Sequence, residues 1–224
     1  MLGIIPAKTN SKRLIGKNVK LFCGKPLIWY TIKQAIKSKK IKKLIVSTDS
    51  ENIGKLSKKF GASFPFLRPK SLCKNKSTLL DVCKHALKHF ENNKIFFSSV
   101  IALQPTSPLR RTKDIENAIK IFKKKRADIV ASFSEAKPSC WYRELSKSGQ
   151  FHKYISKKES IYQMLKKNYL LNGSVYIFSS DFLKSKKKKF KFFSYIMPRK
   201  RSVDIDTIDD FEYASYLYKK NEAK

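Results

Sequence analysis

Apolar runs of strand length alternate with amphipathic stretches of helix length along most of this chain. Strands are expected at 2–6, 43–48, 99–103 and 129–133, and helices at 26–37, 51–60, 78–90 and 113–124. Such alternation is typical of a parallel sheet with helices on both of its faces. The chain is therefore expected to fold as a three-layer α/β domain with a mostly parallel sheet.

A stretch of about three dozen positions, residues 135–171, interrupts this alternation with charged residues, scattered aromatics, a proline and a glycine. The regular pattern returns at 172–178, and a short strand through Ile196 and a helix at 207–219 follow. No linker rich in glycine or proline divides the chain, and 224 residues suit one domain. We predict a single domain over 1–224, in which 135–171 forms an inserted hairpin that acts as a lid or a dimerisation region.

The formal net charge of +33 raises the question of polyanionic partners such as nucleic acid. Only eight of the 50 basic residues are arginines, and the other 42 are lysines. Proteins that read nucleic acid favour arginine, because its planar fork makes bidentate contacts with bases and phosphates. We therefore predict a solvated lysine surface and no specific nucleic-acid partner, and we keep polyanion binding as an alternative.

Membrane and secretory signals are not expected in this sequence. The longest apolar runs, such as 100–103, are far shorter than the roughly 20 residues that span a bilayer. The first residues lack the basic segment and apolar core of an export signal. The four cysteines show neither CxxC spacing nor the density of a disulfide scaffold. We predict a cytoplasmic protein with no membrane partner.

The loops that follow the strands are the expected place for a ligand, since open parallel sheets bind ligands at the carboxyl ends of their strands. The loop after the first strand, residues 7–18, carries four cations and small hydroxyl residues, which suits a polyphosphate. Its single glycine, Gly16, fits neither a Walker A loop nor a GxGxxG dinucleotide loop. ATPases and dinucleotide-dependent dehydrogenases are therefore disfavoured.

Two further segments carry candidate functional residues. Gln104 follows the third strand in a loop stiffened by prolines, and its amide can donate and accept hydrogen bonds at a base edge. In an extended segment, Asp204 and Asp206 would point to one side and could share a hard cation, with Ile205 facing the core. The alternative for the acids is a helix N-cap, a role that Thr207 or Asp206 could take.

Seven motifs occur in one order along the chain: IIPAKTNSKRLIGKN, GKPLIWYTI, VSTDSENI, FGASFPFLRP, LQPTSPLR, NGSVYI and SVDIDTIDDFE. Together they resemble the sugar-acid cytidylyltransferases, and most of all the acylneuraminate (CMP-sialic acid synthetase) branch. The resemblance runs nearly end to end and is weakest over 135–171.

This resemblance implies a nucleotidyltransferase with a Rossmann-like fold that transfers CMP from CTP to the anomeric hydroxyl of a nonulosonic acid and releases pyrophosphate. It implies a homodimer, a magnesium ion, and a place in the biosynthesis of cell-surface polysaccharide. The implied catalytic residues are Lys8, Lys17 and Asp206; the nucleotide would contact Lys8, Ser11, Lys17, Asn18, Arg68 and Gln104; the sugar would contact Gln104 and Asn172; and Mg²⁺ would bind Asp204 and Asp206.

Four positions depart from the family pattern. Lys8 stands where the family usually has arginine, so a point charge replaces a planar fork. Asn75 replaces a common aspartate, and Tyr162 and Leu170 stand where arginines are found in relatives. Because the last two concern the sugar acid, they leave open a different nonulosonic acid as acceptor, such as legionaminic or pseudaminic acid. The alternatives are the eight-carbon acid KDO as acceptor, and a catalytically weak polyanion-binding protein on the same scaffold.

Overall fold

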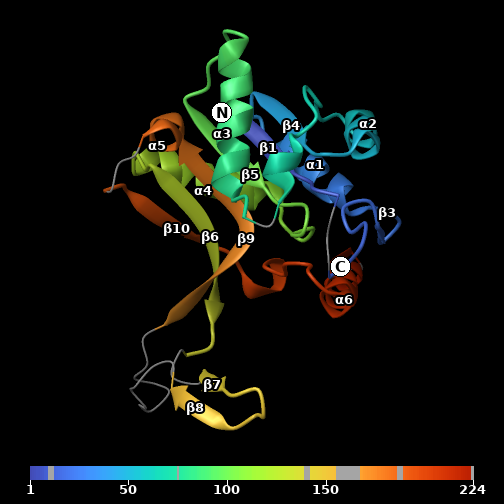
Figure 1. Cartoon of the computed structure of the whole chain (residues 1–224), viewed down its shortest axis with the longest axis vertical. Helices are drawn as coiled ribbons and strands as arrows, with labels where there is room; N and C mark the ends of the chain where they lie inside the picture. Colours follow the sequence, from blue (N-terminus) through green and yellow to red (C-terminus); the bar gives the residue numbers. More distant parts are fainter. Residues whose placement is uncertain (10–12, 75, 139–141, 155–166, 186–188, 223–224) are drawn as a thin grey trace.

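A six-stranded mixed sheet forms the centre of the protein in a computed structural model (Figure 1), which describes residues 1–9, 13–74, 76–138, 142–154, 167–185 and 189–222. Its strands are β1 (Leu2–Pro6), β4 (Lys43–Ser47), β5 (Ser99–Leu103), β6 (Ile129–Ala136), β9 (Asn168–Ser179) and β10 (Phe192–Ile196). Their order is β10-β6-β9-β5-β1-β4, and only β9 runs antiparallel to its neighbours. The sheet is therefore mostly parallel, as predicted.

Helices follow most of the parallel strands, close to the predicted positions. They are α1 (Leu27–Lys37), α2 (Glu51–Lys59), α3 (Leu79–Asn92), α4 (Thr112–Lys124) and α6 (Ile208–Glu222). The short helix α5 (Ser180–Lys184) after β9 and the 3-10 turns η1 (Lys70–Cys73) and η4 (Arg199–Arg201) were not predicted. A short ribbon of β2 (Leu21–Phe22) and β3 (Lys25–Pro26) precedes α1 and was not expected from the sequence.

Two apolar cores lie on opposite faces of the sheet. Along β5, Ile101 and Leu103 join a core with α1 and α4, while Val100 and Ala102 join a core with α3 and α5. Successive strand residues point to opposite faces, so a strand that is buried on both sides reads as a continuous apolar run. The prediction of a three-layer α/β fold is confirmed.

A third apolar cluster attaches α6 to the ribbon and to α1. The ring of Phe22 makes edge contacts with Phe211 at 5.4 Å and with Tyr30 at 5.0 Å between centroids, and all three side chains are buried. Ile205 is fully buried in the same cluster, as predicted. This packing holds the segment before α6 against the first loop of the chain.

Strands β6 and β9 continue beyond the sheet as a two-stranded arm. The predicted strands ended at Phe133 and began at Asn172, but the ladder runs on to the pair Ala136 and Asn168, after an irregularity near Ala131. Pairing continues there because backbone hydrogen bonds do not require an apolar face. Figure 1 shows the arm leading away from the sheet to a hairpin of β7 (Arg143–Leu145) and β8 (Phe151–Tyr154).

Within the described part of the chain, no helix combines the length and the apolar character needed to cross a membrane.

Candidate active site

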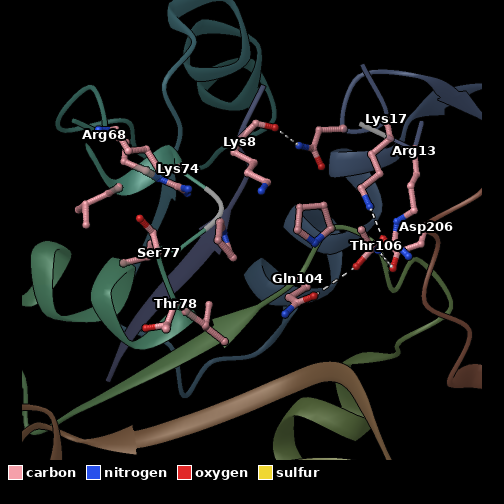
Figure 2. A pocket seen from close by; sticks show the side chains of 16 residues that line it. Lys8, Arg13, Lys17, Arg68, Lys74, Ser77, Thr78, Gln104, Thr106 and Asp206 are labelled. Carbon is pink, nitrogen blue, oxygen red and sulfur yellow. Dashed lines mark hydrogen bonds and ion pairs between the residues drawn. The ribbon is translucent and has the colours of Figure 1, made fainter. Parts of the chain in front are cut away.

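A pocket of about 400 Å³ opens at the carboxyl edge of the parallel strands. Its walls come from the loop after β1, the segment 68–82, the loop after β5 and the residue before Thr207 (Figure 2). Six predicted site residues line it: Lys8, Lys17, Asn18, Arg68, Gln104 and Asp206. Two others, Asp204 and Asn172, do not line it, and Ser11 lies outside the described residues.

Side-chain hydrogen bonds anchor the described residues of the loop after β1. Asn18 is buried, and its Nδ2 donates to the Lys8 carbonyl at 3.0 Å, which closes the loop on itself. Thr9 donates from its backbone nitrogen and its hydroxyl to Asp49 Oδ1 at 2.8 and 3.0 Å, which ties the loop to the end of β4. These hydrogen bonds therefore fix the backbone beside Lys8 and Lys17.

Asp206, in the segment before α6, forms ion pairs with two side chains of that loop. Its Oδ1 accepts from Lys17 Nζ at 2.9 Å and its Oδ2 from Arg13 Nη2 at 2.6 Å. Lys17 Nζ also donates to the Ile205 carbonyl at 2.9 Å. Figure 2 shows these three side chains together on one side of the pocket.

The N-cap of α6 is formed by Thr207. Asp210 N donates to Thr207 Oγ1 at 3.2 Å, and Thr207 N donates to Asp210 Oδ2 at 2.8 Å, which is a reciprocal capping arrangement. The Asp206 carboxylate is not needed for this cap. The Asp206 carboxylate instead forms ion pairs with Lys17 and Arg13. The alternative prediction that its side chain is a helix N-cap is therefore wrong.

Asp204 does not line the pocket and lies beside Gly173. Gly173 has φ +71, and a Cβ placed there would lie 3.1 Å from Asp204 Oδ2 and 3.4 Å from Gln104 Oε1. Asp204 Oδ1 is buried with no hydrogen-bond partner in the described chain. Burial, and then the negative charge of Asp206, raise the pKa of Asp204, against a hydrogen bond from Thr106.

The two acids fit a hard divalent cation. A buried carboxylate oxygen without a partner is costly, and a cation would satisfy it. Mg²⁺ is usually held by one or two carboxylates, with the remaining positions filled by substrate phosphates and water. Among the described residues, no group of three or more His, Cys, Asp or Glu side chains is placed so that it could hold a metal ion. A cation here would therefore take further oxygens from its substrate.

Gln104 is held by a buried arginine. Arg110 is 1% exposed, and its Nη1 donates to the Gln104 carbonyl at 3.2 Å and to the Ser174 carbonyl at 2.6 Å. The Gln104 side chain accepts from Thr106 Oγ1 at 3.4 Å through Oε1. The backbone of the loop is thus fixed, and the amide nitrogen of Gln104 can donate to a ligand.

Arg68 forms part of the opposite wall. Its Nε donates to Ser47 Oγ at 3.0 Å, and its Nη2 donates to the Ser47 carbonyl. Burial lowers the pKa of Arg68, and the nearby Cys73 and Asp49 oppose that effect. The guanidinium bridges the end of β4 to the segment that follows α2.

Asn172 is buried, and its polar atoms are bonded within the protein. Its Oδ1 accepts from Ser132 Oγ at 2.6 Å, and its Nδ2 donates to Ser202 Oγ at 2.9 Å. It links β6, β9 and the segment that leads to Asp204. The predicted contact of Asn172 with a sugar stays a prediction.

Residues 2–222 match the family described as cytidylyltransferase, which covers nearly the whole chain. The chain belongs to the cytidylyltransferase family. The predicted family and enzyme class, a nucleotidyltransferase, are therefore confirmed.

Curated relatives of this cytidylyltransferase include three named enzymes. It is 36% identical to the CMP-N,N'-diacetyllegionaminic acid synthase of Legionella pneumophila, over 99% of this chain and 97% of that protein. It is 32% identical to the pseudaminic acid cytidylyltransferase of Campylobacter jejuni, over 98% and 97%. It is 34% identical to the N-acylneuraminate cytidylyltransferase of Escherichia coli, over 100% of this chain and 54% of that one.

Solved structures share the fold of this cytidylyltransferase. A CMP:2-keto-3-deoxy-manno-octonic acid synthetase, solved in complex with CTP, superposes with a TM-score of 0.74 over 98% of both chains. The sequences are 15% identical, so this likeness concerns the fold alone.

Several residues that line the pocket of this cytidylyltransferase were not predicted as site residues: Arg13, Lys74, Ser77, Thr78, Pro105 and Thr106. Thr78 caps α3, because Asp81 N donates to its Oγ1 at 3.2 Å while Thr78 N donates to Asp81 Oδ2 at 2.9 Å. The spacing of Thr78 and Asp81 is a capping-box signal that could have placed a helix N-terminus, favourable to anions, at this pocket.

The departures from the family pattern fall in different places. Lys8 lines the pocket, so the change from the planar guanidinium of arginine to an ammonium group would affect how a nucleotide is held there. Leu170 lies on the arm, paired with Ser134, with 63% of its surface exposed. Asn75 and Tyr162 lie outside the described residues.

Proposed function

We propose that this cytidylyltransferase transfers CMP from CTP to the anomeric hydroxyl of a nonulosonic sugar acid and releases pyrophosphate. The observation that carries the proposal is the meeting of Lys8, Lys17, Gln104 and Asp206 in one pocket at the carboxyl edge of the sheet. The names of relatives that are 32–36% identical over nearly the whole chain support this acceptor class.

The triphosphate is proposed to bind among the cations of the first loop. Lys8, Arg13 and Lys17 line the same pocket, and Lys74 contributes a further positive charge from the opposite wall (Figure 2). Phosphoryl transfer requires mostly positioning and charge stabilisation, since negative charge is spread over the phosphate oxygens in the transition state. Arg13 and Lys17 are drawn towards Asp206 and are thus pre-positioned for this task.

In the proposed step, the anomeric oxygen forms a bond to the α-phosphorus while the bond from that phosphorus to the bridging oxygen of pyrophosphate breaks. Among the described residues that line the pocket, Asp206 is the carboxylate, and we assign the hydroxyl proton to it. Lys17 stabilises the negative charge that passes to the leaving pyrophosphate. Gln104 is proposed to orient the base and the sugar acid.

Magnesium is proposed as the cofactor, held by Asp204 and Asp206. When bound, it would supply a positive charge that polarises the phosphate oxygens and aligns the α-phosphate.

The use of CTP also favours the predicted cytoplasmic location, where that nucleotide is made.

The acceptor is proposed as a nonulosonic acid without a choice among its members. The identities to the legionaminic, neuraminic and pseudaminic relatives differ by at most four percentage points. KDO is less favoured, because the likeness to a KDO-related enzyme rests on the fold at 15% identity.

The deciding experiment measures pyrophosphate release from CTP, ATP, GTP and UTP with legionaminic, neuraminic and pseudaminic acids and KDO. We expect release with CTP and a nonulosonic acid, and little release with the other nucleotides. A Lys17→Gln variant should lose this activity, while Lys58→Gln, an exposed lysine on α2, should keep it. Release with KDO alone would replace the acceptor, and no release with any acid would favour the polyanion-binding alternative.

We also propose a homodimer formed through the arm. Four apolar side chains of the arm and of the β7–β8 hairpin are exposed by between 46% and 63% of their surface: Leu145, Tyr169, Leu170 and Leu171. Exposed apolar side chains grouped on a projecting element are typical of a surface that a second copy covers. We expect light scattering to show a dimer and a Leu170→Asp/Leu171→Asp variant to be monomeric. A monomer in the unmodified protein would contradict the proposal.

A further inference from the structure

A second pocket of about 190 Å³ lies between α1, the loop before α4 and the C-terminal half of α6. It shares no lining residue with the candidate active site. Five cationic side chains line it, namely Lys33, Lys37, Arg110, Arg111 and Arg201, together with Trp29 and Tyr218. The described residues that line it include no Asp or Glu.

Among the described residues, one of these five cations forms an ion pair with an acid. Arg201 Nη2 lies 2.7 Å from Asp114 Oδ1, and Arg201 Nε donates to Asp114 Oδ2 at 3.0 Å. Lys33, Lys37 and Arg111 make no ion pair with an acid of the described chain. The Lys33 Nζ instead lies 4.4 Å from the centre of the Trp29 ring.

Arg110 adds a buried and poorly compensated charge at the inner wall. Besides the two carbonyls named above, its Nη2 donates to Thr31 Oγ1 at 2.6 Å, so its hydrogen-bond acceptors among the described residues are all neutral. Its Nε has no hydrogen-bond partner among the described residues. Burial lowers the pKa of Arg110 to about 9, and Asp114 opposes this effect. A buried charge without an opposite partner is costly, so an anion bound nearby would be favoured.

Two of these cations are neighbours on one helix. Lys33 and Lys37 are four residues apart on α1 and therefore share a helix face, and both line the pocket together with Arg111. Three uncompensated cations around a small volume suit a group that carries two negative charges. The Trp29 ring offers an apolar wall next to them.

We propose that this second pocket is an anion site that takes a small phosphate-bearing molecule. The phosphate would lie among Lys33, Lys37 and Arg111, and the rest of the molecule would lie against Trp29. The volume is about half that of the candidate active site, which suits a phosphomonoester better than a nucleoside triphosphate.

The test uses the emission of Trp29. The chain has two tryptophans, Trp29 and Trp141, so a Trp141→Phe variant leaves Trp29 as the reporter. The probes are inorganic phosphate and glycerol 3-phosphate, titrated at constant ionic strength. We expect a saturable change in emission with both probes, because a phosphate at Lys33 alters the cation above the ring.

Matched variants show where the probe binds. In the Trp141→Phe background, Lys37→Gln/Arg111→Gln keeps Trp29 and Lys33 and should weaken phosphate binding by about tenfold or more. Lys58→Gln/Lys88→Gln removes the same charge from exposed positions of α2 and α3 and should leave the affinity unchanged. Lys17→Gln, in the candidate active site, should also leave it unchanged. Circular dichroism and the single variants Lys37→Gln and Arg111→Gln guard against a loss of folding.

Three results would overturn the proposal. The first is a Trp29 emission that does not saturate with either probe at constant ionic strength. The second is equal weakening in Lys58→Gln/Lys88→Gln, which would mean that only net charge matters. The third is duplex DNA that displaces phosphate at physiological salt through Lys37 and Arg111, which would make this surface a polyanion contact rather than a small-molecule site.

Discussion

The Lys17 ammonium lies 2.9 Å from Asp206 Oδ1, and this ion pair links residues 189 positions apart in the sequence. The same ammonium donates to the Ile205 carbonyl, and Arg13 holds the other oxygen of Asp206. The first loop and the segment before α6 therefore act as one unit at the carboxyl edge of the sheet. A nucleotide bound there would contact both the first loop and the segment before α6.

Asp206→Asn is expected to lower turnover by at least about a hundredfold at saturating Mg²⁺, on the scale seen when a charge-stabilising group is removed. It removes a proposed metal ligand and proton acceptor, and it leaves Lys17 and Arg13 without an acid. Asp209→Asn, an exposed residue in the first turn of α6, makes the same charge change and should leave turnover near that of the unmodified protein. Steady-state pyrophosphate release measures both. Turnover of Asp206→Asn equal to that of the control would refute the metal assignment.

Gly173→Ala is expected to destabilise the protein and weaken CTP binding. A left-handed backbone costs an alanine about 1–2 kcal/mol, and here the new Cβ would also press on Asp204 and Gln104. Gly149→Ala is the matched control, because Gly149 has φ +84 with open space around its Cβ position. Urea unfolding and CTP titration should show a larger loss for Gly173→Ala on both measures. Equal losses would mean that the contact with Asp204 and Gln104 has no effect.

Asp114→Asn is expected to destabilise the protein by on the order of 3 kcal/mol at neutral pH, because it leaves Arg201 without its partner in a buried place. Burial raises the pKa of Asp114, but hydrogen bonds from Arg201, the Arg111 backbone and Tyr195 outweigh it and lower the pKa. A lowered pKa in the folded state means that this stabilisation is complete above the unfolded pKa of about 3.9 and is lost as the pH falls below it.

The measurement for Asp114 is urea unfolding of both proteins from neutral pH to about pH 3, the range in which an unfolded aspartate titrates. The difference in unfolding free energy between the two proteins should shrink as the pH falls. Glu116→Gln, on the same helix, serves as the control with no such trend. A difference that stays constant with pH would contradict the assignment of the ion pair.

The response to salt should separate enzyme from polyanion binder. Binding of duplex DNA to a lysine surface occurs through counterion release, so it should fall steeply with salt and show no sequence preference. Mg-CTP should survive physiological salt better, because short-range contacts in a partly desolvated pocket are screened less. Titrations of both ligands at low and physiological salt check this. Sequence-selective DNA binding at physiological salt without CTP binding would reverse the proposed function.

Local patterns in the sequence predicted most of the elements and part of the site. Apolar runs placed β1, β4 and β5 because a strand buried on both faces is apolar throughout. Parallel strands have their carboxyl ends at one edge, so the loops that carry Lys8, Lys17 and Gln104 were expected to meet, and they line one pocket.

Packing between distant segments decided the rest. The antiparallel placement of β9 beside β6 buries Asn172 in a network with Ser132 and Ser202, which no local pattern encodes. Arg13 reaches Asp206 only because α6 packs on the β2–β3 ribbon through Phe22 and Phe211. The second pocket likewise combines α1, the loop before α4, Arg201 and α6. Side chains from separate elements meet through tertiary contacts, whereas periodicity reports only the face that each element buries.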